Sequence, residues 1–261
     1  MNRRPLVLCF SGHDPGGGAG IHADIEAIAA QRAHALTVIT AMTVQDSCNV
    51  SRVDAVPTEL LAAQVETLLA DSRIAAIKLG LLGSAAQIPL LLATIRRCGV
   101  PVIGDPILRA GGGAALMAAA MLQALRTELM PNVDLLTPNA AELRRLVPEA
   151  ATLLDAARSL QAQNARQLLV TGGDEAGDEV CNLWLDADGI AHTFRWPRLP
   201  AQFHGAGCTL AAAIAGRIAV GDSWADAIEA GQQYTQQALQ HAYASGRGRL
   251  LPQRTPTGTT P

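Results

Sequence analysis

The strongest local pattern in this sequence is the stretch Phe203-His204-Gly205-Ala206-Gly207-Cys208-Thr209-Leu210, which runs into an alanine-rich segment. Two glycines allow a tight turn and bring backbone N–H groups close to a ligand. Good helix formers follow, so the pattern predicts a loop that opens a helix. A helix N-terminus presents unpaired N–H donors and a positive dipole end, which bind anions, phosphate above all. The stretch therefore predicts an anion site, although a glycine turn before a core helix would look the same.

Cys208 stands at the start of this helix. A thiolate is electrostatically favoured at a helix N-terminus, so we expect the pKa of the thiol to fall. The alternative is an inert, buried cysteine.

Composition limits the classes of protein to consider. The chain has 261 residues, of which 49% are hydrophobic and 16% charged, and its net charge is −3. This suits one large α/β domain or two small ones. The charge gives no reason to expect a nucleic acid or an anionic membrane surface as a partner, so we expect neither.

The five cysteines are scattered and show no CxxC spacing. This argues against a disulfide framework or a structural zinc site and favours a reducing compartment. The apolar run 6–10 is too short for an export signal, and no apolar run reaches the length of a membrane span. We therefore expect a cytoplasmic protein.

Apolar strand patterns and helical patterns alternate along the chain. Strands are expected at 6–10, 36–41, 74–79, 100–104, 133–136 and 167–171, with an edge strand at 50–56 and a hairpin formed by 180–185 and 190–195. Helices are expected at 21–32, 58–72, 84–97 and 223–243, and at 143–160 with a break near Pro148. A further helix is expected to begin at the glycine loop, with Cys208 at its start, and to end near 220. The pattern predicts one doubly wound α/β sandwich over residues 1–244, with a mostly parallel sheet and an antiparallel hairpin. Residues 245–261 are expected to be a disordered tail.

The glycine-rich loop 11–20 lies between the first strand and the first helix. Its spacing fits neither a dinucleotide fingerprint nor a P-loop. Asp24, expected in the first turn of the helix, could accept hydrogen bonds from a substrate or simply complement the helix dipole. Gln45, just past the second strand, could read an amide-like edge of a ligand, or be an ordinary polar loop residue.

Acidic residues recur where strands end. Asp105 follows the strand 100–104, a position typical of metal or phosphate sites because ligands bind beyond the carboxyl ends of parallel strands. Asn139 and Glu142 have capping-box spacing, which structure alone explains, yet a carboxylate there could also hold Mg²⁺ through water. The loop 109–113 could carry Arg109 over a phosphate, or be a linker.

Taken in order and spacing, several motifs resemble those of the hydroxymethylpyrimidine/phosphomethylpyrimidine kinases of thiamine biosynthesis, in the ribokinase superfamily. The resemblance spans residues 6 to 243. The motifs are Ser11-Gly12 through Gly20-Ile21-His22-Ala23-Asp24, Thr40-Ala41-Met42-Thr43-Val44-Gln45, Lys78-Leu79-Gly80-Leu81-Leu82, Asp105-Pro106, Thr137-Pro138-Asn139-Ala140-Ala141-Glu142, Gly172-Gly173 and His204-Gly205-Ala206-Gly207-Cys208-Thr209. Most ribokinase relatives place an Asp base at the end of the last loop, whereas this family places Cys there.

The resemblance implies a ribokinase-like three-layer α/β/α sandwich and an enzyme that is a homodimer. It implies transfer of phosphate from ATP, with Mg²⁺, to 4-amino-5-hydroxymethyl-2-methylpyrimidine and then to its monophosphate. The site residues that it implies fall into four groups: Gly12, Asp24, Gln45 and Leu81 for the pyrimidine; Asn139, Thr171, Gly173 and Ala206 for the nucleotide; Asp105 and Glu142 for the metal; and Gly205, Gly207 and Cys208 for the anion hole, with Cys208 as the base.

Some positions depart from the family's usual pattern. Ala206 stands where a Thr is usual, Thr171 where the family often has Lys, Asp174 where it has His, and Leu81 where it often has Met. Two other functions stay open on the same fold: a kinase for another hydroxymethyl heterocycle, such as pyridoxal, and a catalytically silent pyrimidine sensor.

Overall fold

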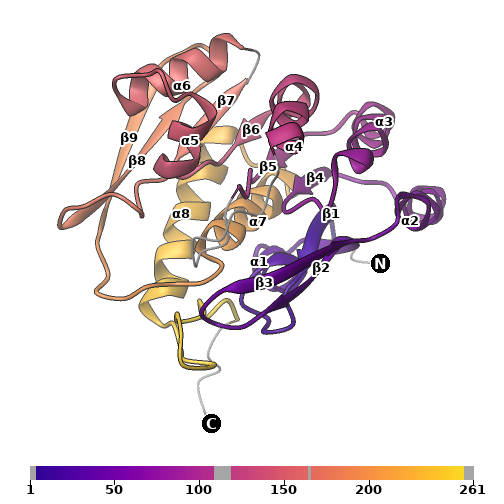
Figure 1. The fold of residues 1–261 in the computed structure, drawn as a ribbon, viewed down its shortest axis with the longest axis horizontal. Helices are drawn as coiled ribbons and strands as arrows, with labels where there is room; N and C mark the ends of the chain where they lie inside the picture. The colour runs from indigo at the N-terminus through magenta and orange to yellow at the C-terminus, as the bar shows by residue number, and fades with distance from the viewer. Residues whose placement is uncertain (1–3, 109–118, 164–165, 256–261) are drawn as a thin grey trace.

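A computed structural model describes residues 4–108, 119–163 and 166–255 of the chain. Within these residues, one mixed sheet forms the centre, with strand order β3-β2-β1-β4-β5-β6-β7-β8-β9 (Figure 1). Neighbouring strands are parallel from β2 through β7, while β3, β8 and β9 run antiparallel to their neighbours. The strands are β1 (Leu6–His13), β2 (His34–Gln45), β3 (Val50–Ala55), β4 (Ala76–Leu79), β5 (Val102–Gly104), β6 (Leu135–Leu136), β7 (Gln167–Val170), β8 (Glu179–Leu185) and β9 (Ala191–Pro197).

Helices cover both faces of the sheet (Figure 1). They are α1 (Gly20–Ala30), α2 (Thr58–Asp71), α3 (Ile88–Cys98), α4 (Ala119–Ala124), α5 (Ala140–Leu146), α6 (Leu153–Ala162), α7 (Ala206–Ala219) and α8 (Trp224–Gln240). Successive side chains of a strand point to opposite faces, and β1 shows the result. Val7 and Cys9 join the apolar core with α1, α7 and α8, whereas Leu8 and Phe10 join the core with α2, α3, α5 and α6. This confirms the predicted three-layer α/β/α sandwich with a mostly parallel sheet.

Finer expectations also hold. The strand pattern 50–56 forms the antiparallel edge strand β3, and the pattern with the Asp-Gly turn forms the hairpin β8–β9. The helical pattern 143–160 is interrupted as expected, because α5 ends at Leu146 and α6 begins at Leu153 on either side of Pro148.

The C-terminal segment differs from the expectation of a disordered tail for 245–261. Residues 245–255 pack against the domain, and Leu251 and Arg254 are buried. The backbone N–H of His204 donates to the carbonyl of Leu250 at 2.9 Å, beside the start of α7. Composition suggested disorder because few apolar residues remain there, yet the segment is docked by these two buried side chains and by backbone hydrogen bonds to Ser47, Gln202 and Tyr243. Residues 256–261 lie outside the described part.

Among the described helices, none combines the length and the apolar character that crossing a bilayer requires.

Candidate functional site

The sequence-predicted site residues gather at the carboxyl end of the parallel strands. β1, β4 and β5 end there, and α7 begins against them (Figure 1). Asp105 directly follows β5, and its backbone N–H donates to the carbonyl of Leu79, the last residue of β4, at 2.8 Å. This is the edge at which open α/β sheets bind ligands.

The glycine loop 14–20, between β1 and α1, is organised by Asp14. Its carboxylate accepts from the backbone N–H groups of Gly16 at 2.8 Å and Ala19 at 2.9 Å. His204 Nε2 lies 2.8 Å from the same carboxylate. Burial alone would raise the pKa of Asp14, but the bond to His204 and the two N–H groups lower it below its usual value. Asp14 thus links the glycine loop to the loop that precedes α7.

The start of α7 requires glycine at position 205. Gly205 is the N-cap, with φ of 87°, a left-handed conformation that favours glycine. A Cβ there would lie 1.8 Å from the carbonyl oxygen of Gly18, so the two loops are in contact. Ala206, Gly207 and Cys208 form the first turn, in which N–H groups have no carbonyl partner within the helix. The predicted loop-to-helix transition is therefore present.

The carboxylate of Asp105 lies over this first turn. A Cβ placed on Gly207 would be 3.5 Å from Asp105 Oδ2, and Asp105 and Cys208 lie close enough for each to shift the pKa of the other. Cys208 is itself buried. Asp105, Gly207 and Cys208 thus form one group at the N-terminus of α7.

The expectation that the pKa of Cys208 falls is wrong for the ligand-free protein. Burial raises the pKa of this thiol to about 12; Lys78 lowers it, and the carboxylates of Asp105 and Asp24 raise it further. A helix N-terminus favours a thiolate by a modest amount. Desolvation and two nearby negative charges outweigh that effect.

Asp24 is part of a fully buried ion pair. Its Oδ1 lies 2.8 Å from Lys78 Nζ, and neither side chain is exposed to solvent. Ser11 Oγ donates to Asp24 Oδ2 at 2.6 Å and accepts from Lys78 Nζ at 3.0 Å. Asp24 lies in the second turn of α1, not the first as expected, so complementing the helix dipole does not account for it.

Burial would lower the pKa of Lys78, but Asp24, Cys208 and Asp105 raise it well above its usual value. Lys78 is therefore a permanent cation beneath the site, and it is not among the site residues expected from the sequence. One signal could have found it. Lys78 is the one charged residue in the apolar strand pattern 74–79, and a buried charge requires a partner.

Asp105 and Glu142 form a second acidic group. Glu142 accepts from the backbone N–H groups of Leu108 and Asn139, both at 3.1 Å, and the Asn139 side chain accepts from the Glu142 N–H at 2.8 Å. The predicted capping box is confirmed. Burial raises the pKa of Asp105 to about 6 and that of Glu142 to about 8, with Asp105 adding to the rise at Glu142.

These two carboxylates fit a magnesium ion. Mg²⁺ prefers oxygen ligands and commonly uses one or two carboxylates together with water and substrate phosphates. The described residues contain no group of three or more His, Cys, Asp or Glu side chains arranged for a metal. A cation near Asp105 and Glu142 would relieve the repulsion that raises the pKa of Glu142.

The residues implied for the nucleotide lie beside the N-terminus of α5. Asn139 and Thr171 form an isolated parallel bridge, and the carbonyl of Gly173 accepts from Arg198 Nη1 at 2.9 Å. Asp174 accepts from the Ala141 N–H at 2.7 Å and so occupies a donor at the start of this helix. Ala206, by contrast, lies at the N-terminus of α7.

The residues implied for the pyrimidine are only partly brought together. A Cβ on Gly12, near the end of β1, would lie 3.0 Å from Leu81 Cδ2, so these two residues face each other. Gln45 pairs with Val50 of β3, three residues beyond Met42, which pairs with the last residue of β1. Its side chain has no hydrogen bond to a described residue. The expected role of Arg109 falls outside the residues that the structure describes.

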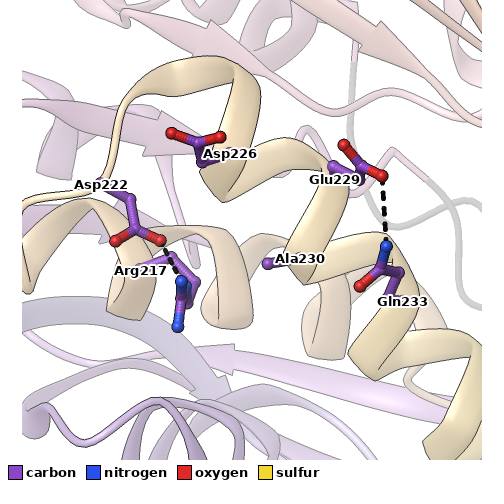
Figure 2. A pocket seen from close by; sticks show the side chains of 6 residues that line it. All are labelled: Arg217, Asp222, Asp226, Glu229, Ala230 and Gln233. Atoms are coloured by element: carbon purple, nitrogen blue, oxygen red, sulfur yellow. Dashed lines mark hydrogen bonds and ion pairs between the residues drawn. The ribbon is translucent and has the colours of Figure 1, made fainter.

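A surface pocket elsewhere does not belong to this site (Figure 2). Arg217, Asp222, Asp226, Glu229, Ala230 and Gln233 line it. Arg217 lies twelve residues along α7 from Gly205, which is about 18 Å at the helical rise. Three carboxylates against one arginine, which is paired with Asp222 at 2.5 Å, would repel a phosphate.

The sequence is similar to proteins of a known family. The sequence profile of the phosphomethylpyrimidine kinase family matches residues 14–252. The hydroxymethylpyrimidine/phosphomethylpyrimidine kinase of Mycobacterium tuberculosis strain H37Rv is 38% identical over 253 residues, which cover 94% of this chain and 91% of that protein.

Solved structures share the fold. A pyridoxal kinase of Bacillus subtilis in complex with ADP matches with a TM-score of 0.86 at 26% identity, covering 97% of this chain and 98% of that one. A phosphomethylpyrimidine kinase of Clostridium difficile 630 matches with a TM-score of 0.77 at 23% identity, covering 91% of this chain and 100% of that one.

The buried ion pair leads to a prediction on stability. Lys78→Met leaves the Asp24 carboxylate buried without its partner, so we expect the free energy of unfolding in urea to fall by about 3–5 kcal/mol. The double variant Lys78→Met/Asp24→Leu should recover most of the loss, because it removes both charges. Arg97→Met, which breaks an exposed ion pair with Glu66, is the control and should cost about 1 kcal/mol or less. An equal cost for Lys78→Met and Arg97→Met would contradict the prediction.

The acidic group leads to a second prediction. Carboxyl NMR titration without metal should show that Asp105→Asn lowers the pKa of Glu142, because it removes a neighbouring negative charge. Asp174→Asn should lower it by a smaller amount, since Asp174 also raises this pKa but contributes less. The exposed Asp178→Asn is the control and should leave it unchanged. A pKa of Glu142 that does not move in Asp105→Asn would disprove the coupling.

Proposed function

The chain belongs to the phosphomethylpyrimidine kinase family, and on this premise we propose that it uses ATP to phosphorylate 4-amino-5-hydroxymethyl-2-methylpyrimidine and then its monophosphate. The observation that carries the proposal is the group at the start of α7, where the Asp105 carboxylate lies over Gly207 and next to Cys208. Phosphoryl transfer depends mainly on positioning and on charge neutralisation, and this group supplies donors and a carboxylate at one point.

In the proposed reaction, the N–H groups of residues 205–208, from Gly205 to Cys208, hold the oxygens of the transferred phosphoryl group. They suit this role because they lack helical partners and carry the positive end of the helix dipole. Mg²⁺, held by Asp105 and Glu142, would neutralise phosphate charge. Asn139, Thr171 and Gly173 are proposed to bind the nucleotide beside α5. Asp174 adds a negative charge there, which would oppose a nucleotide phosphate.

On the substrate side, Gly12 and Leu81 are proposed to contact the pyrimidine ring, and Asp24 and Gln45 its polar edge. The Asp24 carboxylate already accepts from Ser11 and pairs with Lys78. Because neither side chain of this pair is exposed in the ligand-free protein, a ring amino group would reach the carboxylate only after the residues that cover it move.

Cys208 is proposed as the base that takes the proton of the hydroxymethyl group as the alcohol attacks. Since burial raises the pKa of this thiol to about 12, it is protonated in the ligand-free protein at neutral pH. At any pH below this pKa, the thiolate fraction increases about tenfold for each unit by which the pH rises. If the thiolate is the base, kcat/KM rises with pH over the neutral and mildly alkaline range, because kcat/KM reports the ionisation of the free enzyme.

Removal of the thiol tests this role. Cys208→Ala should lower kcat by about 10²–10⁴-fold, leave the pyrimidine KM little changed and remove the rise of kcat/KM with pH. Steady-state kinetics across this pH range measures all three. Unchanged kcat, or a pH profile identical to that of the wild type, would exclude Cys208 as the base while leaving the anion-binding role of the helix intact.

A second candidate function is favoured by the match to the pyridoxal kinase of Bacillus subtilis, the solved structure described above with the higher TM-score and identity. In this alternative, the same site would phosphorylate the hydroxymethyl group of a pyridine ring. The two candidates differ in the ring, so they are separated by the substrate that is consumed.

The test of the proposed function is mass spectrometry of the products after incubation with ATP, Mg²⁺ and either hydroxymethylpyrimidine or pyridoxal, with ADP release measured in parallel. We expect the pyrimidine monophosphate and then the diphosphate. Efficient conversion of pyridoxal alone would favour the second candidate. Calorimetric binding of the pyrimidine without any product would instead indicate a sensor that has lost turnover.

Assembly and location are further parts of the proposal. Met42 and Val44, on β2 next to the edge strand, are 45% and 53% exposed, and such an apolar pair suits contact with a second copy of the chain. All five cysteines are free, which suits a reducing compartment such as the cytoplasm.

A further inference from the structure

Arg254 lies in the C-terminal segment, two residues beyond the end of the family match at 252. Its side chain is 1% exposed, although arginine rarely lies in a protein interior without several partners. The segment that carries it is tied to α8 and to the residues that follow it. Tyr234 Oη donates to the Arg254 carbonyl at 2.7 Å, and the N–H of Gln253 donates to the carbonyl of Ala238 at 2.9 Å.

The guanidinium of Arg254 joins three parts of the molecule. Nη1 donates to the Gly17 carbonyl at 3.4 Å and to Glu26 Oε2 at 3.1 Å, and Nη2 donates to the Gly18 carbonyl. Nε donates to Thr209 Oγ1 at 2.8 Å. The glycine loop, α1 and the first residues of α7 therefore share one side chain.

These contacts act on the site through backbone orientation. The carbonyls of Gly17 and Gly18 point toward Arg254, and in a trans peptide the next N–H points the opposite way. One of these N–H groups, that of Ala19, donates to Asp14. On the other side, Thr209 Oγ1 also donates to the carbonyl of Gly205, the N-cap of α7, at 2.7 Å.

The two loops pack so closely that there is no room for a side chain at position 205. A Cβ on Gly205 would lie 1.8 Å from the Gly18 carbonyl oxygen and 2.8 Å from Arg254 Nη2. The planar, forked guanidinium donates in several fixed directions, which the compact ammonium of lysine does not reproduce. Arg254 therefore determines how closely the glycine loop approaches the N–H groups at the start of α7.

We propose that Arg254 is a positioning residue, which holds the glycine loop 14–20 and the anion-binding turn of α7 at the spacing that phosphoryl transfer requires. The inference rests on the proposed function for its kinetic consequence, but the spacing itself is a property of the free protein. A small misplacement of reacting groups lowers turnover far more than it weakens ground-state binding.

The experiment compares Arg254→Ala and Arg254→Lys with the wild type. Both variants should lower kcat by about 10–100-fold, with a smaller change in the pyrimidine KM. Millimolar guanidinium should restore part of the activity of Arg254→Ala only, because the ion can occupy the vacated space. A chain that ends at Thr255 keeps Arg254 and should behave as the wild type.

Leu160→Ala, in the buried face of α6, controls for stability. It should lower the melting temperature but leave kcat unchanged at temperatures where the protein is folded. If Arg254→Ala keeps kcat within about twofold of the wild type, or loses activity only in proportion to its unfolded fraction, the positioning role is wrong.

Hydrogen exchange separates this inference from the proposed function. In the free protein, Arg254→Ala should exchange faster than the wild type at 14–20 and 205–209, with no change in α6. If the wild type forms no pyrimidine phosphate, the proposed function fails, and the exchange result alone decides the positioning role. Unchanged exchange in both loops would overturn it.

Discussion

The carboxyl end of the sheet depends on the buried ion pair between Lys78 and Asp24. Lys78 comes from β4, Asp24 from α1, and Ser11 of β1 bonds to both, so three elements meet at one pair of charges. Charges without solvent are tolerated only when their partners are held in good geometry. This ion pair therefore holds β1, β4 and α1 together next to the glycine loop that connects β1 to α1.

The same lysine organises the charge around the site. It faces three acidic groups, because Asp24, Asp105 and Cys208 all raise its pKa. The pKa of Glu142 is raised by burial and, next, by the negative charge of Asp105. The ligand-free site thus holds more acidic groups than the single lysine can compensate. A bound cation with a phosphate on the N–H groups of α7 would balance both signs, which is the arrangement a phosphoryl-transfer site needs.

Much of the fold could be predicted because its signals are local. The alternation of Val7 and Cys9 with Leu8 and Phe10 distributes one strand between two cores, and the capping box of Asn139 and Glu142 starts α5 as its spacing indicates. The docked C-terminal segment could not be predicted. Its position depends on residues that are distant in the chain, such as Gly17 and Glu26, which Arg254 contacts from more than 200 positions away, and no local pattern encodes such contacts.

From the amino-acid pattern alone we could predict the layers, the order of the elements along the chain, and the glycine loop that opens a helix beside a cysteine. Those features follow from periodicity and from backbone conformations that neighbouring residues dictate. The packing of distant segments sets the protonation of Cys208, the partner of Asp24 and the place of Arg254. The physical reason is that desolvation and charge pairing depend on which distant segments meet, and a dipole effect expected from local spacing is overruled by the burial that packing imposes.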